Sequence, residues 1–124
     1  MRESSANSVL NQYLREKKHY CYYELKVARG GTFLFSKIED VQDESLPALA
    51  KEGLTWKFSD EDSRRKPCDG GCFPPLPAYL VIKFGGTFCF IKYAQIQHLR
   101  SIGRKSITAA EAVDRASFVV HSAT

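Results

Sequence analysis

Residues 78–93 read AYLVIKFGGTFCFIKY, two apolar runs that are separated by a pair of glycines. The runs 78–84 and 87–93 are rich in aromatic and β-branched side chains, which are typical of strands. Gly85-Gly86 between two such runs is a strong signal for a tight antiparallel turn. The stretch therefore predicts a β-hairpin, and the remaining elements are placed outward from it.

Towards the N-terminus the pattern predicts a helix followed by a second hairpin. Residues 4–17 place apolar side chains on one helical face, with Ser4 or Ser5 as the cap. Residues 19–28 (HYCYYELKVA) are typical of a strand, and residues 29–31 (RGG) of a turn. We expect residues 32–38 to form a strand that pairs back on the first.

Between the two hairpins the sequence predicts a helix, a strand and a long loop. Residues 40–52 have helical periodicity that ends at Gly53, and Pro47 suggests a late start with the proline in the first turn. Residues 54–58 are typical of a strand. The polar, Gly- and Pro-rich loop at 59–77 is longer than a connection requires, so it is a candidate functional segment.

After the central hairpin we expect two helices and a last strand. Residues 94–101 form the first helix, Thr108 and Glu111 are spaced as a capping box for a helix to about Ala116, and residues 117–121 form the strand. Alternation of strands and helices favours a mixed sheet with helices on its faces. The whole chain of 124 residues is expected to be a single α/β (α+β) domain.

Composition limits the environment and the partners. No apolar run is long enough for a membrane span, and the N-terminus lacks the pattern of a signal peptide, so we expect a cytoplasmic protein. The net charge of +4 is compatible with nucleic acid without being diagnostic. Basic residues are concentrated at 64–66 and 100–105, and acidic residues at 39–44 and 60–62.

The four cysteines favour free thiols over disulfides, because the core is large enough without cross-links. Cys21 and Cys89 lie in apolar runs, where a thiol acts as a small hydrophobic group. Cys68 and Cys72 flank a Gly-rich turn and could hold zinc, although four ligands are needed. A small zinc-stabilised adaptor is therefore one open interpretation.

The pair that carries chemistry is Glu24 and Lys26. Two residues apart on a strand, both side chains project from one face, while Leu25 points into the core. In phosphodiester hydrolysis a carboxylate can hold Mg²⁺, and a lysine can orient water and neutralise developing charge. The alternative is a surface ion pair on the polar face of a sheet.

The order helix, strand with Glu-x-Lys, hairpin partner, and helix with Gln42 resembles the PD-(D/E)XK nuclease superfamily, and most closely the Holliday junction resolvase-like proteins of phages and bacteria. The matching stretches are YYELKVARGGTFLFSKIEDVQDESLPAL (22–49), WKFSDEDSRRKPCD (56–69), AYLVIKF (78–84) and GRKSITAAEA (103–112). The resemblance implies a restriction-endonuclease-like fold, Mg²⁺ as cofactor with Mn²⁺ able to substitute, branched DNA as substrate, and a homodimer. A phage-encoded member would work in the host cytoplasm.

Carried over to this chain, the resemblance makes Glu24 and the Leu25 backbone carbonyl metal ligands and Lys26 the catalytic lysine. Gln42 matches a glutamine near the scissile phosphate, and Glu3 matches an acid that some resolvases add to the metal site. One departure is that the superfamily usually places an aspartate on the strand before Glu-x-Lys, whereas no aspartate precedes Glu24 in this chain.

The missing acid must therefore come from elsewhere. Asp69, between Pro67 and two glycines, is the favoured candidate and Asp60 the other, although Asp69 could equally be a turn-forming residue.

The sequence thus predicts a Mg²⁺-dependent endonuclease that acts on branched or structured DNA. Phosphate contacts are expected from two basic groups, Arg64, Arg65 and Lys66 in the loop and Arg104 and Lys105 near the C-terminus. The alternative is a non-catalytic DNA- or partner-binding module that retains the nuclease fold, which the missing aspartate favours.

Overall fold

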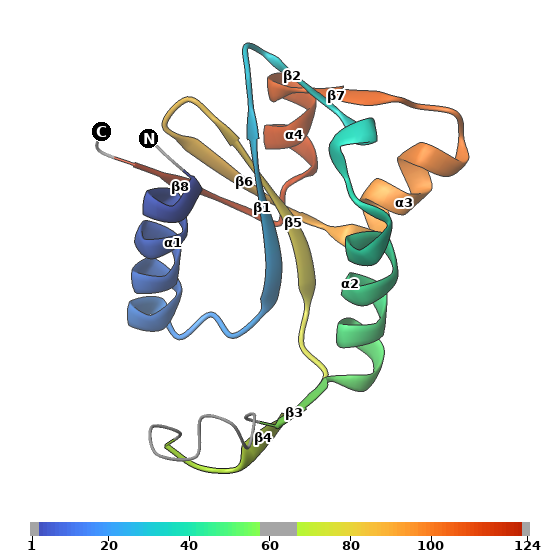
Figure 1. The fold of residues 1–124 in the computed structure, drawn as a ribbon. Coiled ribbons are helices and arrows are strands. Elements are labelled where there is room, and N and C mark those ends of the chain that lie inside the picture. Colours follow the sequence, from blue (N-terminus) through green and yellow to red (C-terminus); the bar gives the residue numbers. More distant parts are fainter. Residues whose placement is uncertain (1–2, 58–66, 123–124) are drawn as a thin grey trace.

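The structure is a computed structural model and describes residues 3–57 and 67–122. It contains a four-stranded sheet, two small two-stranded sheets and the helices that surround them (Figure 1). The elements in chain order are α1 (Glu3–Lys17), β1 (Tyr22–Ala28), β2 (Thr32–Leu34), the 3₁₀ turn η1 (Phe35–Lys37), α2 (Asp40–Glu52), β3 (Leu54–Lys57), β4 (Gly70–Phe73), β5 (Ala78–Phe84), β6 (Thr87–Lys92), α3 (Tyr93–Ser101), β7 (Ser106–Thr108), α4 (Ala109–Arg115) and β8 (Phe118–His121).

The main sheet has the order β1-β5-β6-β8. The predicted hairpin of β5 and β6 is confirmed, and it forms the centre of this sheet. Its turn contains Gly85 at φ 59°, a backbone conformation that glycine adopts without strain. β8 pairs antiparallel with β6, and β1 pairs parallel with β5 over the full length of both strands. The predicted mixed sheet flanked by helices is therefore confirmed, with β1 at one edge.

Both faces of the sheet are covered, which explains why β5 and β6 are apolar at nearly every position. Helix α1 lies on one face, and α2, α3 and α4 lie on the other (Figure 1). The α1 face buries Leu10 and Leu14 of the helix against Leu25, Val81 and Phe90 of the sheet. The opposite core contains Leu80, Ile82, Ile91, Tyr93, Ile96 and Ile107.

The expected hairpin between residues 19–28 and 32–38 is wrong. β2 is only three residues long and pairs antiparallel with β7. Neither β7 nor this pairing was expected from the sequence. Phe33 and Phe35 are buried in the core on the α2 side, next to Ile107. That burial turns the chain away from β1, whose partner β5 contributes a much longer register. Tertiary packing therefore overrides the local hairpin signal.

Helix α2 spans the predicted residues, but the expected place of Pro47 is wrong. The helix begins at Asp40, so Pro47 lies in its interior and not in its first turn. The proline has no N–H to donate to the Asp43 carbonyl, so α2 tolerates one missing backbone bond. Gly53 ends the helix as predicted, at φ 78° and with its N–H donated to the Leu49 carbonyl.

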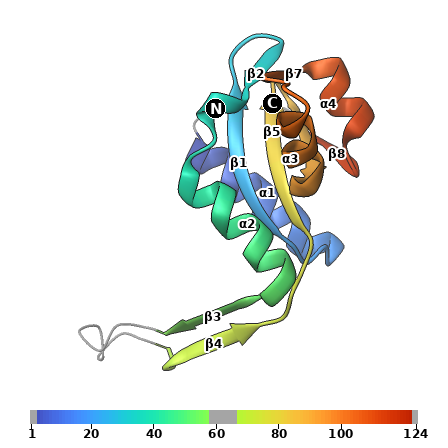
Figure 2. The ribbon, with the colours of Figure 1, turned by 90° about the vertical axis from the view of Figure 1, so that its right-hand side faces the viewer.

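The long loop contains structure of its own. β4 pairs antiparallel with β3, and this hairpin projects from the body of the domain in both ribbon views (Figures 1 and 2). Its base is tied to the sheet, because the Tyr22 hydroxyl donates to the Pro74 carbonyl at 2.9 Å and the Tyr22 N–H to the Pro77 carbonyl at 2.9 Å.

Among the described helices, none has both the length and the apolar character that crossing a membrane requires.

Candidate active site

Glu24 and Lys26 lie on the edge strand β1, on the face of the sheet that α2 covers. Their register partners are Leu80 and Ile82, which belong to the core on that side. The Lys26 Nζ lies 3.8 Å from the Glu24 Oε1, and the two side chains are 16% and 31% exposed. Leu25 points to the other face and is buried. The predicted geometry of the pair is therefore confirmed: both side chains share one face, partly shielded from water.

A hollow of about 380 Å³ opens beside Glu24, between β1 and the first half of α2. Gln42 lines the same hollow, together with Ser45 on the next turn of the helix. The Gln42 side-chain oxygen accepts the Glu39 backbone N–H at 3.1 Å, which stabilises the start of α2. Its amide nitrogen is then the donor available to a ligand. The structure thus brings Glu24 and Gln42 together from segments 18 residues apart in the chain.

Asp69 is not brought to this hollow. It precedes β4 at the end of the hairpin that is farthest from the sheet, where Gly70 pairs with Lys57. From Pro74, at the base of the hairpin, Asp69 is five residues away, about 16 Å of extended chain. Glu24 lies along β1 in the opposite direction. An ion shared by these carboxylates would require the hairpin to fold back over β1.

The remaining acids proposed from the sequence are outside the described residues. Asp60 lies in the segment 58–66, and the side chain of Glu3 is likewise outside them. Within the described ranges no group of three or more His, Cys, Asp or Glu side chains is placed to hold a metal ion. Among the residues that the structure describes, Glu24 is the one acid that lines the hollow.

Glu24 and the Leu25 carbonyl supply some, but not all, of the ligands that a magnesium ion requires. Mg²⁺ keeps several waters and is commonly bound by one or two carboxylates together with substrate phosphates. Glu24 and the Leu25 carbonyl can supply one protein carboxylate and one carbonyl, so the site as described depends on a phosphate or a second acid to complete it.

Of the predicted phosphate-binding residues, Arg64, Arg65 and Lys66 lie outside the described residues. Lys105 is exposed and lines a hollow of about 410 Å³ with Arg100 and Ser36. Arg100 belongs to the basic stretch 100–105 but was not among the predicted phosphate-binding residues, and its guanidinium pairs with Asp43 of α2 at 3.2 Å. Lys105 adds an exposed positive charge to this hollow, whereas Arg100 and Arg104 each pair with an acid.

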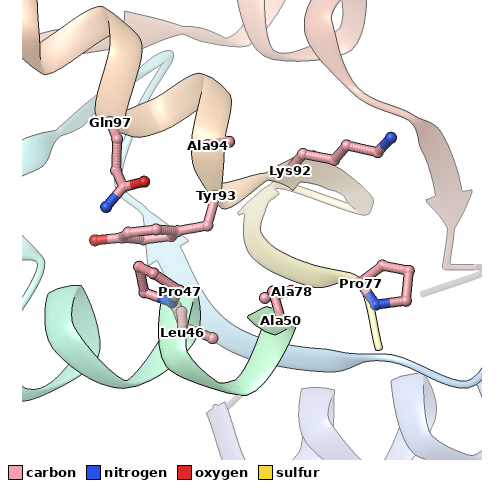
Figure 3. Close-up of a pocket in the computed structure, with 9 residues that line it drawn as sticks. All are labelled: Leu46, Pro47, Ala50, Pro77, Ala78, Lys92, Tyr93, Ala94 and Gln97. Carbon is pink, nitrogen blue, oxygen red and sulfur yellow. The ribbon is translucent and has the colours of Figure 1, made fainter. Parts of the chain in front are cut away.

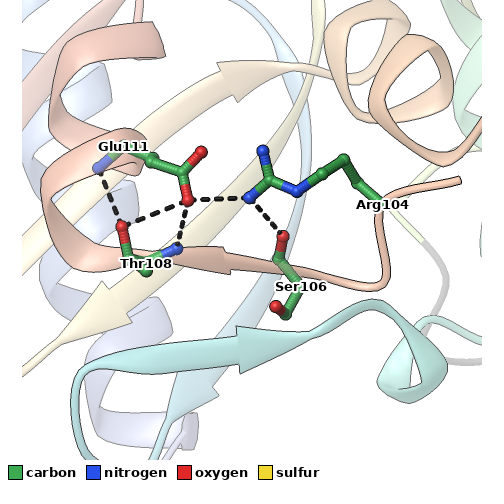
Figure 4. Close-up of polar contacts among 4 residues, drawn as sticks. All are labelled: Arg104, Ser106, Thr108 and Glu111. Atoms are coloured by element: carbon green, nitrogen blue, oxygen red, sulfur yellow. Dashed lines mark hydrogen bonds and ion pairs between the residues drawn. The ribbon is translucent and has the colours of Figure 1, made fainter. Parts of the chain in front are cut away.

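Arg104 is committed to the start of α4 (Figure 4). Its guanidinium donates to Glu111 Oε1 at 2.7 Å and to the Ser106 carbonyl at 3.0 Å. Glu111 also accepts the Thr108 N–H, and the Thr108 hydroxyl accepts the Glu111 N–H, which confirms the predicted capping box. The Arg104 hydrogen bond lowers the pKa of Glu111 to about 2. Arg104 therefore stabilises the start of α4, a role that its prediction as a phosphate-binding residue did not include.

A second hollow, of about 400 Å³, lies between α2, α3 and the ends of β5 and β6 (Figure 3). Its lining is mostly apolar, and Lys92 extends away from the Tyr93 ring. The Tyr93 hydroxyl donates to Asp43 at 2.5 Å, and burial together with this bond raises the Tyr93 pKa well above its usual range. Among the described residues no carboxylate lines this hollow, so the hollow beside Glu24 is the better candidate for a metal-dependent reaction.

No family model, no curated protein and no solved structure matches this chain.

Proposed function

We propose that the protein is a metal-dependent endonuclease that hydrolyses phosphodiester bonds of branched or structured DNA, similar to Holliday junction resolvases. The observation that carries the proposal is the partly buried pair of Glu24 and Lys26 on an edge strand, beside a hollow that Gln42 also lines. The Glu24 carboxylate and the Gln42 amide line this hollow, and the Lys26 ammonium lies 3.8 Å from Glu24, so the three groups could bind a phosphate with an accompanying cation.

The roles of the three side chains follow from their charges. Glu24 would bind the divalent ion, which when bound supplies positive charge at the phosphate and a polarised water. Lys26 would orient the attacking water and neutralise charge on the phosphate in the transition state. Its side chain is only 16% exposed, and this partial shielding strengthens the effect of its charge. Gln42 would donate its amide N–H to a phosphate oxygen.

The proposal is tested by incubating a four-way junction with the protein in Mg²⁺, Mn²⁺ and excess EDTA. Cleavage is expected with either metal and not in EDTA. Glu24→Gln keeps the shape and removes the charge, so it should lose cleavage at low metal concentration. Cutting that continues undiminished in EDTA would exclude the metal mechanism.

Two further substitutions decide which acid completes the site. Asp69→Asn and Asp60→Asn are matched in chemistry, and only one of them is expected to abolish cleavage. If Asp69→Asn is active while Asp60→Asn is inactive, the acid favoured from the sequence is the wrong one. If both cut like the parent protein, neither carboxylate belongs to the metal site.

A second candidate function is a DNA- or partner-binding module without catalysis. It is favoured because Glu24 is the one acid at the hollow among the described residues, whereas a catalytic divalent ion commonly has more than one carboxylate ligand. Junction binding without cleavage under any divalent metal would favour this candidate.

A further inference from the structure

Cys68 and Cys72 form a pair of exposed thiols that the proposed nuclease site does not use. Both are free, whereas Cys89 is buried in β6 and Cys21 is half-buried before β1. Their C-x₃-C spacing falls within the range of zinc-binding pairs. Exposed thiols with this spacing are accessible to a metal ion, which the buried thiol of Cys89 is not.

The β3–β4 hairpin presents Cys72 on a polar face. Cys72 is the register partner of Thr55, and the Thr55 hydroxyl donates to Cys72 Sγ at 3.7 Å. A hydrogen bond to a ligating sulfur is the kind of contact that orients metal ligands. Trp56 and Phe73 stack on the other face of the hairpin, with ring centroids 6.0 Å apart, so they do not cover the thiol.

The backbone between the two cysteines is adapted to a close turn. Gly70 lies against β3, where a Cβ would meet the Trp56 carbonyl oxygen at 2.2 Å. The Cys68 thiol donates to the Gly70 carbonyl at 3.5 Å, so its sulfur is turned back towards β4. Both sulfurs therefore lie on the same short segment of the hairpin.

One chain supplies two of the four ligands that structural zinc requires. No third His, Cys, Asp or Glu joins them among the described residues. The hairpin projects from the body of the domain (Figure 2), so the hairpins of two copies can approach face to face. Two-fold symmetry would then double two thiols to four.

Lys57 supplies positive charge beside the pair. It is the register partner of Gly70, which lies between the two cysteines in the sequence, and it lies on the same face as Cys72, where a positive charge favours the thiolate form. Asp69, between the two cysteines in the sequence, adds a charge of the opposite sign.

We propose that Cys68 and Cys72 of two copies bind one zinc ion in a tetrahedral four-thiolate site that joins their hairpins. The proposal does not depend on the nuclease activity, which concerns a different metal at Glu24. It assigns the exposed thiols a structural role in assembly.

The test is a titration of the full chain, reduced and metal-free, with Co²⁺ as a spectroscopic substitute for Zn²⁺. Thiolate-to-cobalt charge-transfer bands and tetrahedral ligand-field bands are expected to saturate at one ion per two chains, and added Zn²⁺ should abolish them. Cys68→Ser and Cys72→Ser should each lose the four-thiolate spectrum. Cys21→Ser is the control and should keep it.

Three results would overturn the proposal. Saturation at one ion per chain would show that a second copy supplies no ligand. An unchanged spectrum in Cys68→Ser or Cys72→Ser would place the ion elsewhere. The absence of any thiolate band would exclude the site.

Discussion

Gly53→Ala should destabilise the domain by about 3 kcal/mol, because two costs coincide at this position. Gly53 has φ 78° and ψ −161°, a region that is essentially restricted to glycine and costs other residues about 1–3 kcal/mol. An added Cβ would also lie 2.2 Å from the Phe73 carbonyl oxygen, about 1.2 Å short of the ordinary contact distance of 3.4 Å. The base of the β3–β4 hairpin would have to move away from the end of α2.

The matched control is Gly30→Ala. Gly30 has nearly the same φ, 76°, but nothing lies within 4 Å of its Cβ position, so only backbone strain of about 1–2 kcal/mol is expected. Urea unfolding followed by far-ultraviolet circular dichroism measures both variants, since the single tryptophan, Trp56, lies on the hairpin and reports on it locally. Equal losses in the two variants would refute the close contact between Gly53 and Phe73.

Three further outcomes are expected. Leu10→Ala, at a fully buried position of α1, should cost about 2–5 kcal/mol in urea unfolding, and a loss below 1 kcal/mol would contradict the packing of α1 on the sheet. Because the folded pKa of Glu111 is lowered from 4.5 to about 2, the stabilising effect of Glu111 is present above pH 4.5 and is lost towards pH 2. Glu111→Gln should therefore flatten acid unfolding in that window, and an unchanged acid transition would contradict this. Arg64→Ala with Arg65→Ala should weaken junction binding and reduce its salt dependence, and an unchanged salt slope would exclude these residues from phosphate contact.

The sequence was sufficient for elements whose signals are local. The β5–β6 hairpin has its turn glycines between two apolar runs, α2 spans the predicted residues, and the box of Thr108 and Glu111 opens α4. The shared face of Glu24 and Lys26 follows from strand alternation alone, and the structure confirms it.

The partners of the strands could not be predicted, because long-range packing determines them. The Gly30-Gly31 turn indicated a hairpin with β1, yet Phe33 and Phe35 are buried elsewhere and β1 pairs with β5. β7 has three residues, too few for a periodic signal. β4 was predicted as loop because Gly70 and Gly71 have low strand propensity. Gly70 is nevertheless suited to the pairing, because the backbone of β3 lies too close to it for a side chain.

The candidate site shows the same division. The hollow that Glu24 and Gln42 both line depends on how α2 packs beside β1. Gln42 was predicted as a site residue only from a family resemblance. Arg104 was predicted to bind phosphate on the strength of its charge. Its bond to Glu111 depends on a tertiary contact that the position of a charge in the chain does not reveal.

The most direct test of the central claim is the single-turnover cleavage rate of a four-way junction by Lys26→Ala in saturating Mg²⁺. The parent protein and Lys92→Ala, which removes an exposed lysine at the end of β6, are the references. The rate should fall by about two orders of magnitude or more while junction affinity is largely retained, because the proposed mechanism uses the Lys26 charge mainly in the transition state. A rate equal to that of the parent protein would contradict the account and leave Glu24 and Lys26 as a structural ion pair.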